Sequence, residues 1–186
     1  MTRPTRADAR RNRELLLEAA VRAFTDRGLD ATLDAIAKDA GVGIGTLYRH
    51  FPTRDALIEA AYRNELTRLC DAVPELLGAQ SPDKALRAWM DRYIDYMATK
   101  RGMASALQAV IDSGGNPYAH SRDRLTGALG TLLSAGVDAG TLRGDVAAAD
   151  VFAALSGISL SAGRPEQREQ AGRLLDLLLA GLRRRG

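Results

Sequence analysis

The sequence has very few of the side chains on which disulfide frameworks and metal sites depend. Its only cysteine is Cys70, and its only histidines, His50 and His120, lie far apart in a chain of 186 residues. A single cysteine cannot form a disulfide within the chain, so nothing indicates an oxidising compartment and we expect the cytoplasm. The two histidines, without a cysteine pair, form neither a zinc motif nor a convincing Ser/His/Asp constellation. We therefore expect no metal, no cofactor and no catalytic residue.

Long apolar runs are also missing. The stretch Leu15–Leu17 is ended by Glu18, and the run from Leu177 to Leu182 has only six residues. Both are too short for a signal segment or a membrane-spanning helix, so we expect no membrane partner. Aromatic residues make up only 5% of the chain, which is low for a β-sandwich.

The residues that are present favour a helical globular protein. Hydrophobic residues make up 46% and charged residues 26% of the chain, which is long enough to bury a core. Prolines divide the sequence into helix-length intervals without a sustained strand pattern, so the expected fold class is all-α. The predicted helices cover about residues 10–27, 33–40, 44–51, 53–73, 82–102, 103–112, 119–139, 147–162 and 165–184.

Positive charge is concentrated at the start of the chain, although the net charge is only +3. Residues 1–13 contain five arginines and a single acid, Asp8. Such a segment is typical of a flexible basic arm, which we place at residues 1–9. Arg3 and Arg6, followed by Arg10, are candidates for binding phosphates, because binding them would release counterions.

Residues 33–51 have the spacing of a helix-turn-helix. Ala37 is small where two helices would cross, and Gly41 stands in the turn where a positive φ is needed. Three apolar side chains supply a small core: Ile36, Val42 and Leu47. The alternative is an ordinary helical hairpin with a polar outer face.

The second helix of this pair has the composition of a DNA-reading helix. At about 100° per residue, Leu47 and Phe51 share a buried face. The opposite arc carries Gly45, Thr46, Arg49 and His50, with Tyr48 on one flank. Such a surface can approach a groove closely and hydrogen-bond phosphates and base edges.

At these positions the chain resembles the TetR family of bacterial repressors. The resemblance is dense over about residues 10–60. It runs through Leu16-Leu17-Glu18-Ala19-Ala20, Phe24, Gly28, Thr32, Ile36-Ala37, Ala40-Gly41-Val42, Gly45-Thr46-Leu47-Tyr48-Arg49-His50-Phe51 and Leu57. Residues 139–145 also look like the family's turn between its seventh and eighth helices. The resemblance implies nine helices in two domains.

The resemblance also implies a division of labour along the chain. After the arm, residues 10–52 would form the DNA-binding domain, 53–80 a connecting helix, and 81–186 a domain for ligand binding and dimerisation. Gly43 stands where a serine commonly caps the recognition helix, Ile44 where a polar residue is frequent, and Arg54 where lysine is usual. These departures affect which operator is bound.

The predicted DNA contacts divide into base reading and phosphate binding. Arg49 is the expected base reader, because a guanidinium can pair with a guanine edge. The complete predicted set is Arg3, Arg6, Arg10, Thr32, Gly45, Thr46, Tyr48, Arg49, His50 and Arg54.

The second half of the chain carries aromatic and methionine side chains that are suited to line a cavity for a small-molecule effector. The predicted effector residues are Trp89, Tyr93, Tyr96, Met97, Met103, Leu107 and Phe152. Plain core packing is the competing interpretation for each of them. No cluster of buried charged residues indicates the charge of the effector.

The last two predicted helices have leucine faces and small residues suited to a subunit interface. The predicted dimer residues are Val151, Leu155, Ile158, Leu174, Leu175, Leu178 and Leu182. The alternative is that these faces are buried within one subunit. A helix-turn-helix protein, however, normally uses two-fold symmetry to bind two half-sites of double-stranded DNA.

The sequence as a whole predicts a homodimeric repressor that binds a palindromic operator and is released by a small-molecule effector. The sequence is also compatible with an activator. A helical enzyme or carrier is the rival from another class. It would need a catalytic acid, base or nucleophile inside the aromatic cavity, and we find none in the sequence.

Overall fold

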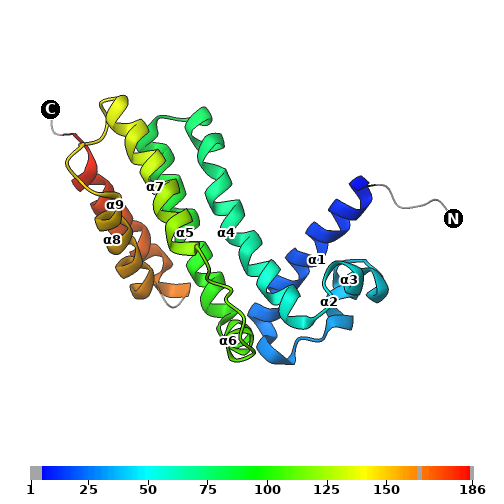
Figure 1. Ribbon diagram of the computed structural model, residues 1–186. Helices are drawn as coiled ribbons and strands as arrows, with labels where there is room; N and C mark the ends of the chain where they lie inside the picture. The colour runs from blue at the N-terminus through cyan, green and yellow to red at the C-terminus, as the bar shows by residue number, and fades with distance from the viewer. Residues whose placement is uncertain (1–5, 163–164, 185–186) are drawn as a thin grey trace. The chain divides into compact units, whose positions relative to one another are not determined.

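The computed structural model describes residues 6–162 and 165–184 (Figure 1). Within these ranges the regular structure is helical, apart from one isolated β-bridge between Leu142 and Arg183. The α-helices are α1 (Arg6–Arg27), α2 (Leu33–Asp39), α3 (Ile44–His50), α4 (Arg54–Ala79), α5 (Pro82–Gly102), α6 (Ala104–Asp112), α7 (Ser121–Asp138), α8 (Ala148–Ser161) and α9 (Arg168–Leu182). Two short 3-10 helices are η1 (Gly28–Asp30) and η2 (Pro165–Gln167). The predicted all-α fold is confirmed.

Capping side chains set the starts of two helices. The Thr32 hydroxyl accepts a hydrogen bond from the Ala35 amide at 3.2 Å at the start of α2. The Thr53 hydroxyl accepts one from the Ala56 amide at 3.1 Å at the start of α4. Each bond satisfies an amide that has no partner within its helix. Gly41 follows α2 with φ +66°, which confirms that its turn requires a positive φ.

The prediction that the fourth helix ends near Val73 is wrong. α4 continues through Pro74 to Ala79. Proline removes one backbone hydrogen bond, but Leu69, Val73 and Leu76 are all buried on this stretch of the helix. Burial of this apolar face therefore outweighs the local preference against proline.

The described residues form two compact units. The N-terminal unit contains the residues up to Glu65 together with Thr99–Ala119, and the C-terminal unit contains Leu66–Ala98 and the residues from His120 onward. Packing therefore groups α6 with the first helices of the chain, whereas the sequence suggested that all residues after 81 act together. The functional assignment of the predicted domains stays a prediction.

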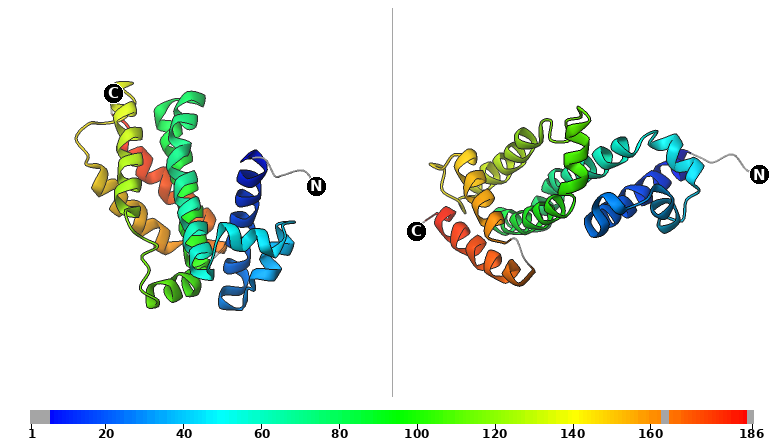
Figure 2. Two further views of the ribbon diagram at one scale, coloured as in Figure 1. Left: turned by 45° about the vertical axis from the view of Figure 1, so that its right-hand side comes forward. Right: turned by 90° about the horizontal axis from the view of Figure 1, so that it is seen from below.

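The N-terminal unit is built on α1, which packs against α2 and α3 (Figure 2). The core side chains include Leu16, Leu17, Phe24, Ile36 and Leu47, all fully buried. The end of α5 and the start of α6 also pack closely on this unit. A Cβ added to Gly102 would lie only 2.5 Å from Thr25 Cγ2, and one added to Gly28 would lie 2.7 Å from Ser105 Oγ.

In the C-terminal unit α7 packs on α8, and α8 packs on α9 (Figures 1 and 2). The chain after α9 pairs with the loop before α8: the Arg143 amide donates to the Leu182 carbonyl at 2.9 Å, and the Arg184 amide donates to the Thr141 carbonyl at 3.1 Å. These bonds fix the end of α9 against the loop between α7 and α8.

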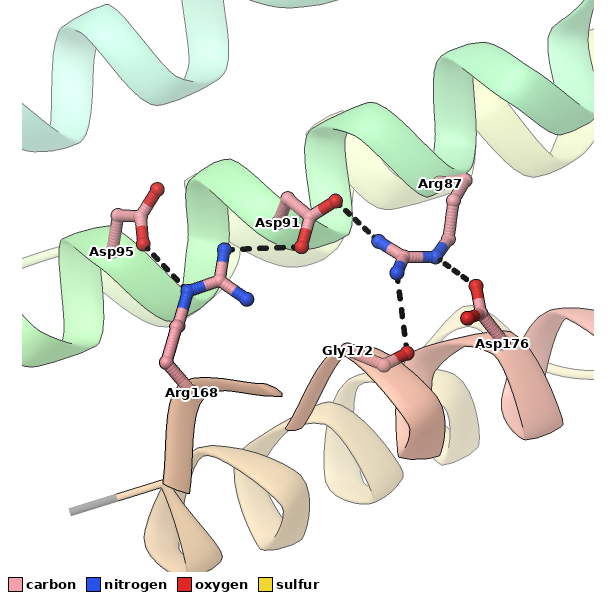
Figure 3. Close-up of polar contacts among 6 residues, drawn as sticks. All are labelled: Arg87, Asp91, Asp95, Arg168, Gly172 and Asp176. Atoms are coloured by element: carbon pink, nitrogen blue, oxygen red, sulfur yellow. Dashed lines mark hydrogen bonds and ion pairs between the residues drawn. The ribbon is translucent and has the colours of Figure 1, made fainter. Parts of the chain in front are cut away.

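A charged network connects α5 to α9 in the same unit (Figure 3). The Arg87 guanidinium donates to Asp176 at 2.6 Å and to the Gly172 carbonyl at 3.1 Å, and it pairs with Asp91. Arg168 donates to Asp91 at 3.0 Å and to Asp95 at 3.1 Å. Because Asp91 joins both arginines, the contacts form a continuous network that orients α9 on α5.

No helix in the described ranges is both long enough and apolar enough to span a membrane.

Candidate functional site

The turn before α3 positions this helix without a capping side chain. Gly43 has an extended backbone, and its carbonyl accepts hydrogen bonds from the Thr46 and Leu47 amides at 2.8 and 3.2 Å. Leu47 is fully buried in the N-terminal unit. The buried leucine fixes the rotation of α3 about its axis, and thereby decides which side chains face outward.

The outer arc of α3 carries Gly45, Tyr48 and Arg49, which are all exposed. Tyr48, which the sequence placed on one flank, has 49% of its surface accessible. Residues three and four positions apart lie on the same face of a helix, which brings Tyr48 and Arg49 beside Gly45. Thr46 and His50 are half-buried at the edges of the arc.

Three arginines lie on one face of α1, and one of them contacts the end of α3. Arg6 and Arg10 are exposed, and Arg10 donates to Glu14 at 3.1 Å. The prediction of a flexible arm over residues 1–9 is wrong for residues 6–9, because α1 already begins at Arg6. The Arg13 guanidinium lies 5.3 Å from the centre of the Phe51 ring, at the C-terminal end of α3. The sequence did not single out Arg13 as a site residue, although its spacing from Arg6 and Arg10 places all three on one face of α1.

Two of the predicted DNA-binding residues are Thr32 and Arg3, of which the structure describes only Thr32. Thr32 is exposed, but its hydroxyl is already the acceptor that caps α2. Arg3 lies outside the described residues, so the prediction of a basic arm contact rests on the sequence.

Arg54 differs from the other predicted phosphate ligands because its guanidinium already has partners in the chain. It donates to the Ala31 carbonyl at 2.5 Å and to the Leu29 carbonyl at 2.8 Å. The guanidinium also lies 5.1 Å from the centre of the Phe24 ring. Arg54 therefore connects the start of α4 to α1 and to the segment that enters α2. This arrangement gives it a structural role beside any contact with phosphate.

Four of the predicted effector residues form one aromatic cluster in the C-terminal unit. Tyr93 stacks on Trp89 with ring centres 5.9 Å apart, and it meets Phe152 edge-on at 5.9 Å. The rings of Tyr93 and Tyr96 are 6.3 Å apart. The Trp89 indole donates to the Leu69 carbonyl at 3.0 Å. α5 and α8 thus bring these rings together, and their role in binding an effector stays a prediction.

The remaining predicted effector residues are placed differently. Met97 is half-buried on α5, whereas Met103 and Leu107 are fully buried in the N-terminal unit. Trp89 and Tyr93 are also almost completely buried, so core packing accounts for them in this structure. Phe152, like Met97, retains accessible surface.

The predicted dimer residues fall into two groups. Four of them are buried within the chain and have little surface left for a partner: Val151, Leu155, Leu175 and Leu182. Three are half-buried: Ile158, Leu174 and Leu178. The most exposed large apolar side chains on these helices are Leu160 at 77% and Leu177 at 70%, which the predicted set omitted. The helical period predicted apolar faces but could not show which leucines the neighbouring helices cover.

No group of three or more potential metal ligands occurs among the residues that the structure describes. Burial raises the pKa of the Cys70 thiol, which keeps it protonated.

Two family profiles match the chain. "Bacterial regulatory proteins, tetR family" matches residues 16–61, and "Transcriptional regulator SbtR-like, C-terminal domain" matches residues 81–184. The first covers the helix-turn-helix, and the second covers α5 to α9.

Solved structures of similar proteins extend the match to nearly the whole chain. The TetR transcriptional regulator SCO0520 from Streptomyces coelicolor is 58% identical over 94% of this chain and 99% of that chain, with a TM-score of 0.90. A TetR regulatory protein from Mycobacterium vanbaalenii is 34% identical over 97% of this chain and 100% of that chain, with a TM-score of 0.79.

A regulator from Chromohalobacter salexigens matches over a shorter stretch. HTH-type transcriptional regulator BetI 1 of Chromohalobacter salexigens is 40% identical over 86 residues, which are 45% of this chain and 43% of that relative. The matched proteins are transcriptional regulators, a class without enzymatic activity. The chain belongs to the TetR family of DNA-binding transcriptional regulators.

Proposed function

We propose that this protein is a cytoplasmic homodimeric repressor that binds a palindromic operator through α3 and leaves it when a small molecule binds. The observation that carries the proposal is the exposed arc of Gly45, Tyr48 and Arg49 on α3, in a unit whose first helix also exposes a row of arginines. This surface combines close approach, hydrogen-bond donors and positive charge, which are the requirements for a helix that enters a major groove.

Within this surface the side chains suit different contacts. The exposed Arg49 can reach a guanine edge with two donors, and the Tyr48 hydroxyl can donate to a phosphate. Arg6, Arg10 and Arg13 supply positive charge along one face of α1, where they would release counterions from the duplex. Thr46 and His50, which are half-buried at the edges, are further candidates for phosphate contacts.

The proposed dimer is supported by the outer faces of α8 and α9. Leu160 and Leu177 are largely exposed, and the nearby Gly157 and Gly181 offer no side chain that would hold another helix away. A second copy could therefore cover the leucines with close helix contacts. Two recognition helices related by a two-fold axis would read the two halves of a palindrome.

The proposed effector response is supported by the aromatic cluster of Trp89, Tyr93, Tyr96 and Phe152. Apolar rings with a few hydroxyl groups suit the binding of a small molecule. An effector releases the operator only when it binds the state with low DNA affinity more tightly than the state with high affinity. The emission of Trp89, the single tryptophan, provides a direct signal of binding at this cluster.

The experiment that tests this function begins with selection of bound duplexes from genomic DNA. We expect an enriched sequence with two inverted half-sites close to a promoter. A reporter gene placed behind that promoter should be expressed less when the protein is present. Increased expression would show an activator, and the absence of any enriched sequence would contradict operator recognition.

A further inference from the structure

Lys100, Tyr118 and Tyr62 form a cluster in the N-terminal unit that the proposed DNA surface and the aromatic cluster do not use. Lys100 lies in the last turn of α5, Tyr118 in the loop between α6 and α7, and Tyr62 on α4. The Lys100 Nζ lies 4.2 Å from the centre of the Tyr118 ring. That ring meets the ring of buried Tyr62 edge-on, with centres 5.3 Å apart and planes at 85°.

The loop that carries Tyr118 is fastened to α4 and α6. The Ser113 hydroxyl donates to Asp55 at 2.7 Å, and Arg63 donates to the Asn116 carbonyl at 3.2 Å. The Gly115 amide donates to the Val110 carbonyl at 2.9 Å. These three bonds hold the loop, so the position of Tyr118 beside Lys100 is determined by the fold.

Two groups of the cluster, the Lys100 ammonium and the Tyr118 hydroxyl, make no hydrogen bond or ion pair among the residues that the structure describes. The Lys100 ammonium lies over the Tyr118 ring. Neighbouring carboxylates on α4 have other partners: Asp55 accepts from Ser113, and Glu59 pairs with Arg63. A positive charge and a phenol therefore lie together without the anion that would normally accompany them.

The charges of these groups are suited to an anion. Burial lowers the pKa of the Lys100 amine, because the half-buried ammonium has lost part of its hydration. Burial also raises the pKa of Tyr118, with a smaller contribution from Tyr62, and so keeps its hydroxyl a donor. The aromatic ring compensates for only part of the lost hydration of the ammonium. An oxyanion would offset the remaining cost and accept hydrogen bonds from both groups.

We propose that Lys100 and Tyr118 bind the carboxylate or phosphate group of a small molecule. The assignment of that molecule as the effector rests on the proposed function, whereas the binding itself does not. An oxyanion bound at Lys100 would lie at the last turn of α5, which packs against α1 of the DNA-binding helices. Gly102, two residues after Lys100, packs on Thr25 of α1, and Ser105 packs on Gly28. A shift of the last turn of α5 would therefore reach α1 directly.

The chain allows a direct test because it contains only three lysines: Lys38, Lys84 and Lys100. The full-length protein, labelled with ¹³C at the lysine ε-carbons, would be titrated with octanoate, benzoate and inorganic phosphate at millimolar concentrations. Octanamide and benzamide provide neutral probes of the same shape. The Lys100→Gln variant assigns the signal, and Lys84→Gln is the matched control on the exposed part of the same helix.

We expect at least one oxyanion to shift the Lys100 signal saturably and to raise the pKa of that amine by about one unit or more. The signals of Lys38 and Lys84, and the titrations with the amides, should show no such change. The Tyr118→Phe variant should bind the same oxyanion about fivefold more weakly, because one hydrogen bond is lost. This ratio separates binding at the cluster from a general effect of ionic strength.

Three results would overturn the proposal: no specific change at Lys100 with any oxyanion, an equal change with the amides, or a change only with duplex DNA. A fragment of operator is included as a separate titration for the last of these. If the oxyanion binds Lys100 but the protein recognises no selected duplex, the proposed regulatory function fails and the oxyanion site stands. The two proposals are thus tested independently.

Discussion

Arg54 is the side chain for which structure and sequence suggest different roles. The resemblance predicts a phosphate contact, but the guanidinium donates to the Leu29 and Ala31 carbonyls and lies over Phe24. We predict that Arg54→Ala lowers the free energy of unfolding by about 2 kcal/mol, because hydrogen bonds from a charged donor are lost. Denaturant titration measures this change.

Arg54→Lys is the matched variant, since it keeps the charge but cannot reproduce the two-carbonyl contact. If the contact with α1 and with the segment that enters α2 matters, the lysine variant should also be destabilised. An unchanged unfolding free energy would contradict this structural role of the guanidinium.

Arg49 provides the clearest test of base reading, because it is exposed on α3. Arg49→Ala should weaken binding to the selected operator by about 1–3 kcal/mol and relax the preference at one base position. Tyr48→Phe, which removes only a hydroxyl, should weaken binding similarly on all sequences. Affinity measured on a set of single-base operator variants distinguishes the two. A uniform loss for Arg49→Ala would place Arg49 on the phosphates instead.

Single side chains also show the limits of what the sequence could predict. The spacing of Leu47 and Phe51 gave the correct buried face of α3, because the helical period alone determines which residues share a face. The two carbonyl partners of Arg54 are more than twenty positions away in the chain, and no local pattern encodes such contacts. For the same reason the cluster of Lys100 and Tyr118 was not apparent from the sequence.

The carboxyl group of Asp83 at the start of α5 should make the stability of the protein depend on pH. Hydrogen bonds from the Ser81 hydroxyl and from the Arg183 guanidinium, both at 2.8 Å, lower the pKa of the Asp83 carboxyl. Because its pKa is lower in the folded state, the stability that Asp83 contributes is present near neutral pH and lost as the pH falls through the folded pKa.

Asp83→Asn should therefore reduce the free energy of unfolding by about 1 kcal/mol at neutral pH, and by less below about pH 4. Denaturant titrations of both proteins at several pH values give this difference. A constant difference across that range would mean that the ionised carboxylate is not the stabilising form.

Helix prediction succeeded where a terminus has its own local signal. Thr32, Thr53 and Pro82 mark helix starts, because capping and the fixed φ of proline act within a few residues. It failed at Pro74, since the apolar face of α4 is buried by residues distant in the chain. The sequence also did not predict that α6 belongs to the N-terminal unit. This grouping depends on contacts such as that of Gly28 with Ser105, which cannot be predicted from the order of the helices along the chain.

For the whole molecule, the exposed leucines of α8 and α9 predict that operator binding depends on dimerisation. Leu177→Arg should dissociate the proposed dimer by placing a charge in an apolar interface, and it should leave the subunit folded because this side chain is 70% exposed within one chain. Sedimentation would report the mass, and circular dichroism the helicity. Operator affinity should fall by orders of magnitude as the second half-site is lost. A variant that remains dimeric would place the interface elsewhere.

The most direct test of the account is equilibrium binding of the full-length protein to its selected operator duplex over a range of salt concentrations. We predict that the logarithm of the association constant falls linearly and steeply with the logarithm of salt concentration, with two protomers bound per duplex. Arg49→Ala should lose operator preference while keeping most of this salt dependence. The absence of salt-dependent binding to any selected duplex would contradict the assignment of α3 and the row of arginines on α1 as a DNA-binding surface.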